Sequence, residues 1–476
     1  MTQPTIPLWL LLSLALALVV FAATLGLGWD RSYWYDEVFT LGYAGVGRPI
    51  DWPLLKSDVH PPTYALMVRF MAQTLGLDPT GFALRLANLP ALFAVAWAFW
   101  LLREVMDLRR RMLLACLLLV NFYTLMLGLD LRSYALMLGF GLLAHVLFLR
   151  EVSGLPPRHI PLMLTCALLS SLHFFGAAIG LSILAFSAYL GWHRGMSLGV
   201  VLARVILAGL LTSGVLAWVL VYSETLAATG GNNWIRFGPD PWLDFIGWQG
   251  LAMLVALLSL VLRRSGHGRP IPRPAKQMLL PAALVLAVTL AISLHSPVIS
   301  GRNLTVLVPP VLLFIVMAVP GSLFTENLGL GKAGARGLGI AGGVAVLLVA
   351  LIGARLLDST TRNGQMIRWV LAEALLPACE GAPIFVKRPD QLDEVAQTAL
   401  TGRVQRPPLN YPLYDPALIP ADCPVLGMGW HELGPVSDVV DFMTERGEAV
   451  EAVLPPDPRL AAQGLQTSGY VIIRKP

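Results

Sequence analysis

Groups of polar residues at the ends of apolar segments carry most of the chemistry that this sequence could do. A carboxylate can deprotonate an acceptor hydroxyl, and Arg or His donors can stabilise a departing phosphate. Charges at membrane depth are costly, so they usually line a cavity or a pathway. The groups are Asp36 with Glu37, Asp58 with His60, Asp130 with Arg132 and Tyr134, and Arg302, and His173 lies at a further helix end.

Each group also has a purely structural explanation, which the sequence alone leaves open. Carboxylates favour helix N-termini, ion pairs close tight turns, and long Arg side chains anchor helices at the membrane interface. Asp36 with Glu37 could thus cap a helix, Asp130 with Arg132 could be such an ion pair, and Arg302 could be such an anchor. Asp58 and His60 could be ordinary loop residues, and His173 could be a packed or capping histidine.

The composition predicts an α-helical polytopic membrane protein. The chain has 476 residues, of which 56% are hydrophobic and 13% charged, and its mean hydropathy is +0.68. Apolar runs long enough to cross a bilayer recur along most of it, and runs that are continuous rather than alternating indicate helices. We predict about eleven spans, at 7–29, 83–102, 112–128, 134–149, 160–176, 178–192, 198–221, 243–262, 277–294, 303–319 and 337–356.

Basic residues between the predicted spans set the expected orientation. Loops rich in Arg and Lys alternate with loops that are poor in both, and the positive-inside rule puts the basic set in the cytoplasm. The polar groups would then face the periplasmic side of a bacterial inner membrane, as would the loop 222–242, and 63–77 would be an interfacial or re-entrant helix. The net charge of +5 does not indicate a nucleic-acid partner, because the basic residues do not gather on a soluble face.

Residues 357–476 differ in character from the rest of the chain. Short β-like runs occur at 383–387, 424–428 and 470–474, with a helical pattern at 437–446. We therefore predict a small soluble α/β domain on the periplasmic side, after a transmembrane module over 1–356 whose outer loop 30–82 carries interfacial helices. In an oxidising compartment, Cys379 and Cys423 are candidates for a disulfide.

The order of the polar motifs resembles the GT-C-fold membrane glycosyltransferases over about residues 1–320. The similar branch holds the protein O-mannosyltransferases, the aminoarabinose transferase of lipid A and the bacterial family 39-like proteins. Asp130 stands where that branch usually has Glu, and Asn303 stands where it usually has an aromatic residue. The segments that carry the resemblance are YDE after the first span, then HPP, DLRSYAL at 130–136, LHFFG at 172–176 and SPVISGRNLTVLVPPVLLFI at 296–315.

The resemblance implies a GT-C-like fold and an inverting transfer of a hexosyl or pentosyl group from a polyprenyl-phosphate donor. The acceptor would be a hydroxyl of a lipid, a glycan or a protein in the cell envelope. Asp36 is then the expected catalytic base, Asp130 assists it, and His60 and Arg302 contact the donor phosphate. The expected substrate site also includes Glu37, Asp58, Arg132, Tyr134 and His173.

Some members of this family need a divalent metal ion and others do not, so the sequence does not decide whether this protein uses one. Carboxylates and a histidine could in principle bind such an ion, and the available residues are Asp36, Glu37, Asp58, His60 and Asp130.

Two functions from other classes remain as alternatives. A transporter or lipid flippase would require ionisable residues near the centres of its spans and broken helices in the two paired halves of the chain. A non-catalytic scaffold of envelope enzymes would act through its C-terminal domain. The charges at helix ends favour the transferase.

Overall fold

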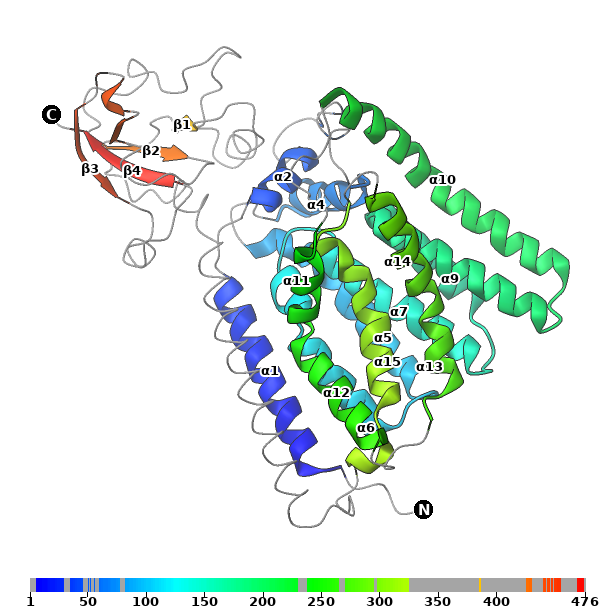
Figure 1. The fold of residues 1–476 in the computed structure, drawn as a ribbon. Coiled ribbons are helices and arrows are strands. Elements are labelled where there is room, and N and C mark those ends of the chain that lie inside the picture. The colour runs from blue at the N-terminus through cyan, green and yellow to red at the C-terminus, as the bar shows by residue number, and fades with distance from the viewer. Residues whose placement is uncertain are drawn as a thin grey trace. The chain divides into compact units, whose positions relative to one another are not determined.

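The computed structural model describes a helical membrane protein (Figure 1). It contains five described helices long and apolar enough to cross a membrane, or six if one bent pair counts as a span. The predicted span 337–356 lies outside the described residues, so the total of about eleven stays a prediction. The described residues are 6–29, 35–45, 50, 52, 55, 60–77, 82–229, 238–264, 270–294, 298–324, 385–386, 425–429, 440–441, 443–445, 447, 449–454 and 469–474.

The chain divides into two compact units, 1–25 with 56–64 and 88–356, and 26–55 with 65–87 and 357–476. The predicted division at 357 stays a prediction. The described helices of the first unit are α1 (Leu8–Trp29, which runs past the unit's edge), α5 (Leu89–Leu102), α6 (Leu108–Leu119), α7 (Tyr134–Val152), α8 (His159–Leu172), α9 (Phe174–His193), α10 (Leu198–Thr229), α11 (Asp240–Trp248), α12 (Gly250–Arg264), α13 (Arg273–Met278), α14 (Leu280–Ser293) and α15 (Val308–Ala318).

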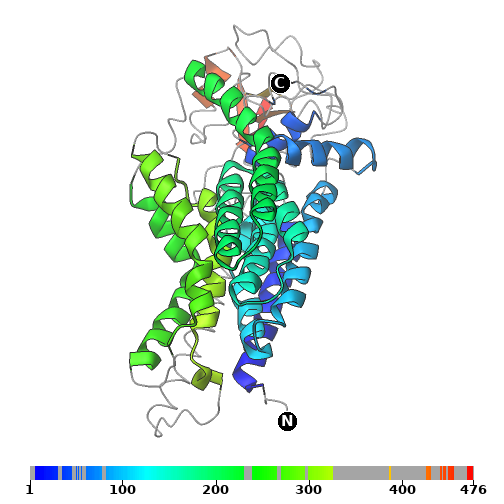
Figure 2. The same cartoon turned by 90° about the vertical axis from the view of Figure 1, so that its right-hand side faces the viewer.

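Helix α7 forms the centre of the first unit. It packs against α5, α8 and α9, and 94% of its most apolar stretch is buried, against 17% for α1. A helix that is apolar all round can be buried by protein or by lipid. Helix α7 is buried by protein, because its neighbouring helices pack closely against it. A Cβ at Gly139 would lie 2.8 Å from the Cα of Ala91 in α5, so this glycine lets the two backbones approach. Figure 2 shows the neighbouring helices α8 to α10, in teal and green, lying along one another.

Several predicted spans are broken or shifted in the structure. The stretch 112–128 is not one helix, because α6 already begins at Leu108, ends at Leu119 and is followed by a π-helical turn, η2 (Tyr123–Leu127). The early start has a local cause: the Asp107 carboxylate accepts the Arg110 backbone N–H at 3.0 Å and caps the helix. The stretch 243–262 is likewise divided into α11 and α12, which meet at 75°.

Helix α10 corrects the predicted loop at 222–242. The helix continues to Thr229, so the first part of that loop is helical. The sequence Ser223–Thr229 contains neither Pro nor Gly, and nothing in it would stop a helix. The last described span begins with a 3-10 turn, η3 (Arg302–Leu307), and continues as α15, whose prolines lie in the first helical turn.

The second unit contains α2 (Tyr35–Ala44), most of α4 (Thr63–Gln73) and most of the 3-10 turn η1 (Phe82–Asn88). Helix α2 ends at Ala44 and is followed by Gly45, whose φ of 59° lies in the left-handed region that favours glycine. The Arg69 side chain of α4 donates hydrogen bonds to the carbonyl oxygens of Ala44 and Gly45 at 3.0 and 2.8 Å. A cation therefore caps the negative end of α2. The helix predicted at 63–77 is confirmed as α4, although its place at the interface stays a prediction.

The described C-terminal residues form a four-stranded sheet in the order β1-β2-β4-β3. Strands β1 and β2 pair in parallel, and the other neighbours are antiparallel. Three of these strands overlap the β-like runs expected from the sequence, and β3 was not expected. A soluble α/β domain over all of 357–476 stays a prediction. The strands are β1 (Phe385–Val386), β2 (Val425–Gly429), β3 (Val450–Leu454) and β4 (Gly469–Arg474).

Candidate active site

The candidate site lies in the first unit, at one end of three helices that pack against one another. Helix α7 begins at Tyr134, α8 ends at Leu172 and α9 begins at Phe174. The N-termini of α7 and α9 present the positive ends of their helix dipoles here. The residues before Tyr134 and the break at His173 are therefore close to the positive ends of these two dipoles, which is a setting that suits an anion.

His60 and Arg132 meet at this end from distant parts of the chain. An Arg132 guanidinium nitrogen lies 3.2 Å from Nδ1 of His60, and both residues are buried. A guanidinium can only donate, so Nδ1 of His60 is the acceptor and the imidazole carries its proton on Nε2. His60 can thus offer a neutral N–H donor without becoming an imidazolium.

His173 and Tyr134 complete a compact group of rings around His60. The His60 and His173 ring centres are 4.7 Å apart at 71°, and Tyr134 lies 6.3 Å from His60. Nδ1 of His173 accepts the Phe175 backbone N–H at 3.1 Å, so His173 caps α9 and holds its proton on Nε2. Burial, together with the nearby charge of Arg132, lowers the pKa of His173 well below its usual 6.5. His173 is therefore a neutral imidazole.

Asn88 links this group to the turn that carries Asp130, and the sequence analysis missed it. Its amide nitrogen donates to the carbonyl oxygens of Gly128 and Asp130 at 3.2 and 2.7 Å. Its amide oxygen accepts the Tyr64 hydroxyl at 2.9 Å. Tyr64 lies two residues after the His60-Pro61-Pro62 segment, so one amide joins two of the predicted motifs. The available signal was an Asn immediately before a helix that begins with Leu-Pro.

Arg302 is the first residue of η3, and the loop before it has contacts of its own. The Tyr123 hydroxyl donates to the carbonyl oxygen of Gly301 at 2.6 Å, which ties the π-helical turn to this loop. A Cβ at Gly301 would come within 3.2 Å of the Trp248 ring, so the position accepts glycine best. The Asn303 side chain donates to the carbonyl oxygen of Val298 at 2.9 Å. The Asn303 side chain thus closes the loop that precedes the half-buried Arg302. Asn303 stands where the family that the motifs resemble usually has an aromatic residue.

The bend between α11 and α12 adds a second residue that sequence reasoning missed. The Asn121 amide oxygen accepts the Tyr123 backbone N–H at 3.0 Å, which turns its nitrogen toward the Gln249 amide oxygen at 2.8 Å. The Gln249 amide nitrogen is then buried with no hydrogen-bond partner among the described residues. Such a donor is costly unless water or a ligand satisfies it, so Gln249 joins the residues that could contact a substrate.

Glu37 forms a buried ion pair in the second unit. Its two carboxylate oxygens accept from Nε and a terminal nitrogen of Arg85 at 3.0 and 2.9 Å, and both side chains are almost fully buried. This bidentate pair gives Glu37 a structural function, while its predicted contact with substrate stays a prediction. Asp36 lies in α2, but its side chain is outside the described part of the chain, as is the whole of Asp58.

The remaining predictions concern a metal ion and a disulfide. The described residues contain no group of three or more His, Cys, Asp or Glu that could hold a metal ion. Two of the residues named for such a site have no described side chain, so metal binding stays a prediction. Cys379 and Cys423 also lie outside the described residues, and their disulfide stays a prediction.

The fold and the placement of its polar groups together define a class of protein. The chain is a multi-pass helical membrane protein with polar residues gathered at shared helix ends, which is the arrangement expected of the GT-C fold. The sequence matches no protein-family model and no curated protein. Solved structures therefore provide the comparison.

The structure is similar to that of ArnT from Cupriavidus metallidurans, the lipid A aminoarabinose transferase, which has the GT-C fold. The ArnT structure bound to undecaprenyl phosphate matches with a TM-score of 0.56 at 14% identity, over 98% of this chain and 97% of that one. The apo structure of ArnT gives 0.53 at 15% identity over the same shares. The resemblance inferred from the motifs is thus confirmed at the level of the fold.

A weaker likeness extends to the oligosaccharyltransferase of Archaeoglobus fulgidus. Its apo form matches with a TM-score of 0.40 at 12% identity, over 85% of this chain and 61% of that one. A TM-score this low carries no weight here.

Proposed function

We propose that the protein is an inverting glycosyltransferase that moves a sugar from a polyprenyl-phosphate donor to an acceptor hydroxyl. The observation that carries the proposal is the meeting of His60, Arg132 and His173 at one end of a membrane fold. That fold is similar to a structure that holds undecaprenyl phosphate. A lipid-linked phosphate needs both an apolar surround for its tail and donors for its head.

The reaction requires a base, a path for the electron pair and donors for the leaving group. In the proposed step, a carboxylate takes the proton of the acceptor hydroxyl, whose oxygen forms a bond to the anomeric carbon of the sugar. The bond from that carbon to the phosphate oxygen breaks, and polyprenyl phosphate departs with the electron pair. Attack opposite the leaving group inverts the anomeric centre. Hydrogen-bond donors that are fixed in advance stabilise the charge that grows on the phosphate.

The residues fill these roles as follows. Asp36 is the proposed base, and Asp130 assists in orienting the acceptor. Arg132 is the proposed principal phosphate contact, since a guanidinium suits phosphate geometry. His60, with its proton on Nε2, is a second donor.

Further contacts extend the proposed site. Arg302 belongs to the proposed phosphate contacts, and the rings of Tyr134 and His173 pack around His60. Glu37 and Asp58 remain proposed contacts to the sugar or the acceptor. A divalent ion at the carboxylates would add charge stabilisation to the same leaving group.

The proposed setting is a bacterial inner membrane, with the reaction and the C-terminal part on the periplasmic side. This orientation follows from the positive-inside rule. The acceptor is a hydroxyl of a lipid, a glycan or a protein in envelope assembly, and membrane lipids surround the donor tail. Nucleic acid is no partner in this proposal.

The test compares the envelope glycans and glycolipids of a deletion strain carrying the wild-type gene or the variant Asp36→Asn. We expect the wild type to restore the missing glycoconjugate and Asp36→Asn to leave it absent, with equal amounts of folded protein in the membrane. Asp107→Asn is a matched control, because it makes the same change in a carboxylate that caps α6. Full restoration by Asp36→Asn would contradict the assignment of the base.

A further inference from the structure

Trp100, near the end of α5, lies between two guanidinium groups, those of Arg103 and Arg158, that the proposed reaction does not use. The guanidinium carbon of Arg103 lies 4.5 Å from the centre of the Trp100 ring, and that of Arg158 lies 5.3 Å from it. Trp100 is itself 44% exposed. One aromatic ring thus gathers two guanidinium groups at a helix end, where cation–π attraction holds them together against their mutual repulsion.

The carboxylate beside this group does not balance its charge. Glu104 pairs closely with Arg150, and its other oxygen lies 3.8 Å from Arg158. In the described part of the chain, the guanidiniums of Arg150 and Arg158 pair with the Glu104 carboxylate, and the charge of Arg103 acts on the same group. Each guanidinium has five N–H donors and suits the bidentate recognition of phosphate. The chemistry of this group is complementary to a phosphate anion.

Apolar stripes lead away from the same group along two helices. On α5, Phe93, Trp97 and Trp100 are spaced to lie on one face, and the first two are 73% and 40% exposed. Helix α8 begins directly after Arg158 with an exposed stripe of the same kind, formed by Ile160, Leu164 and Leu168. Both stripes start at the helix ends that carry the guanidiniums, since α5 ends at Leu102 and α8 begins at His159.

We propose that Trp100, Arg103 and Arg158 form a binding site for an anionic phospholipid, with the headgroup phosphate on the two guanidiniums and the acyl chains along α5 and α8. A zwitterionic lipid would bring a positive group to a cluster that is already positive, so the charge favours an anionic headgroup. A free phosphate ion would leave the apolar stripes unused. The site is separate from the proposed reaction, which involves the other ends of α7, α8 and α9.

The test is native mass spectrometry of the full-length protein in detergent, titrated with phosphatidylglycerol or with phosphatidylcholine of the same acyl chains. The variant Arg103→Gln with Arg158→Gln removes both guanidiniums. The matched control, Arg273→Gln with Lys276→Gln, removes the same charge from exposed positions in α13. A third variant, Trp100→Leu, keeps the apolar surface but removes the ring, and it serves if the double variant does not fold.

We expect the wild type to bind phosphatidylglycerol more tightly than phosphatidylcholine. The loss of both guanidiniums should weaken phosphatidylglycerol binding by about tenfold and remove the preference. Trp100→Leu should weaken it less, and the α13 control should leave it unchanged. The proposal is overturned by an equal loss in the control, by unchanged binding in both site variants, or by inorganic phosphate that competes as well as the lipid.

Discussion

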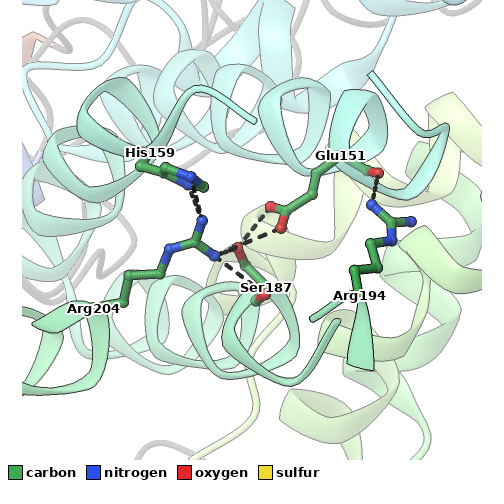
Figure 3. A network of polar contacts seen from close by, with 5 residues as sticks. All are labelled: Glu151, His159, Ser187, Arg194 and Arg204. Carbon is green, nitrogen blue, oxygen red and sulfur yellow. Dashed lines mark hydrogen bonds and ion pairs between the residues drawn. The ribbon is translucent and has the colours of Figure 1, made fainter. Parts of the chain in front are cut away.

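The two ends of helices α7, α8 and α9 each hold a buried polar cluster, and the clusters differ in the charges they join. At one end, the Glu151 carboxylate of α7 accepts the Ser187 hydroxyl at 2.6 Å and pairs with Arg204 of α10 at 3.7 Å (Figure 3). At the other end, the Arg132 guanidinium meets the His60 imidazole, and the turn that holds Arg132 also carries the buried Asp130.

The Glu151 cluster is a closed network in which an anion and a cation are held by several partners. Arg204 also donates to the Ser187 side chain at 3.2 Å and contacts His159, and Arg194 donates to the backbone oxygen of Glu151 at 2.6 Å (Figure 3). These contacts join α7, α8, α9 and α10. A buried pair of opposite charges that is held by several hydrogen bonds within the bundle is a structural feature.

This difference shows how to separate a structural cluster from a functional one in the same bundle. Burial and distance alone would not do so, because both clusters are buried and both are connected by hydrogen bonds. The partners do, since the Glu151 carboxylate already holds its cations within the bundle. The other end combines the Arg132 guanidinium with two helix N-termini, which is a setting that suits an anion.

The largest expected effect follows from breaking the Glu151 network. Glu151→Gln leaves Arg204 buried without its counter-charge, and such a change typically costs about 3–5 kcal/mol. We expect a marked fall in the thermal unfolding temperature in detergent, measured by intrinsic fluorescence, with sugar transfer per folded molecule unchanged.

A double variant sharpens this prediction. Glu151→Leu with Arg204→Met removes both charges and should destabilise the protein less than Glu151→Gln alone. If the double variant is the less stable of the two, the network is not held by its ion pair.

The next effect concerns Arg132 at the other end. Arg132→Gln should lower sugar transfer by about 100-fold, the usual scale for loss of one preorganised donor in an active site. Arg132→Lys should restore little of it, because an ammonium lacks the planar donor geometry. A transfer assay normalised to folded protein measures both. If Arg132→Gln instead lowers the unfolding temperature and leaves transfer per folded molecule unchanged, as expected for Glu151→Gln, Arg132 has a structural function.

Substitution of Asn88 should have a smaller effect, on both stability and sugar transfer. Asn88→Ala leaves the carbonyl oxygens of Gly128 and Asp130 without this donor, which should cost about 1–3 kcal/mol of stability. Tyr64→Phe removes only the hydroxyl that orients Asn88 and should cost about 1 kcal/mol. Thermal unfolding and transfer should both fall in the order wild type, Tyr64→Phe, Asn88→Ala. A Tyr64→Phe variant that is worse than Asn88→Ala would contradict the proposed chain of contacts.

The smallest effect is a pH dependence at Glu104, on the Arg-rich side. The hydrogen bond from Arg150 lowers the pKa of Glu104 below its usual 4.5. A lowered carboxyl pKa contributes stability that is present above the usual value and is lost as the pH falls through the folded-state value.

Thermal unfolding of the wild type and Glu104→Gln across pH measures this contribution. The wild type should be slightly more stable at pH 7, and the difference should shrink below pH 4.5 and vanish once the pH lies below the lowered folded-state pKa. A difference that persists in acid would show that packing and not charge is lost in the variant.

The sequence predicted which helix ends share a side because hydropathy and basic loops fix the direction of successive spans. That logic placed His60, Arg132 and His173 together, and the structure brings them into contact. It also located β1, β2 and β4 from short β-branched runs.

The breaks in the helices could not be predicted in the same way. The interruptions after α6 and at Gln249 are joined by a hydrogen bond between Asn121 and Gln249, which are 128 residues apart. The pairing of Glu37 with Arg85 spans 48 residues. Local propensity carries no information on partners so distant, and an apolar window hides a helix that bends within it.

The central claim is that the His60–Arg132 end binds the phosphate of a lipid-linked donor, whereas the Glu151 end does not. The most direct test is the affinity of purified protein for undecaprenyl phosphate, measured for the wild type, Arg132→Gln and the control Ser187→Ala. We predict that Arg132→Gln binds about tenfold or more weakly and that Ser187→Ala binds as the wild type does. Unchanged binding by Arg132→Gln, or an equal loss in both variants, would contradict the claim.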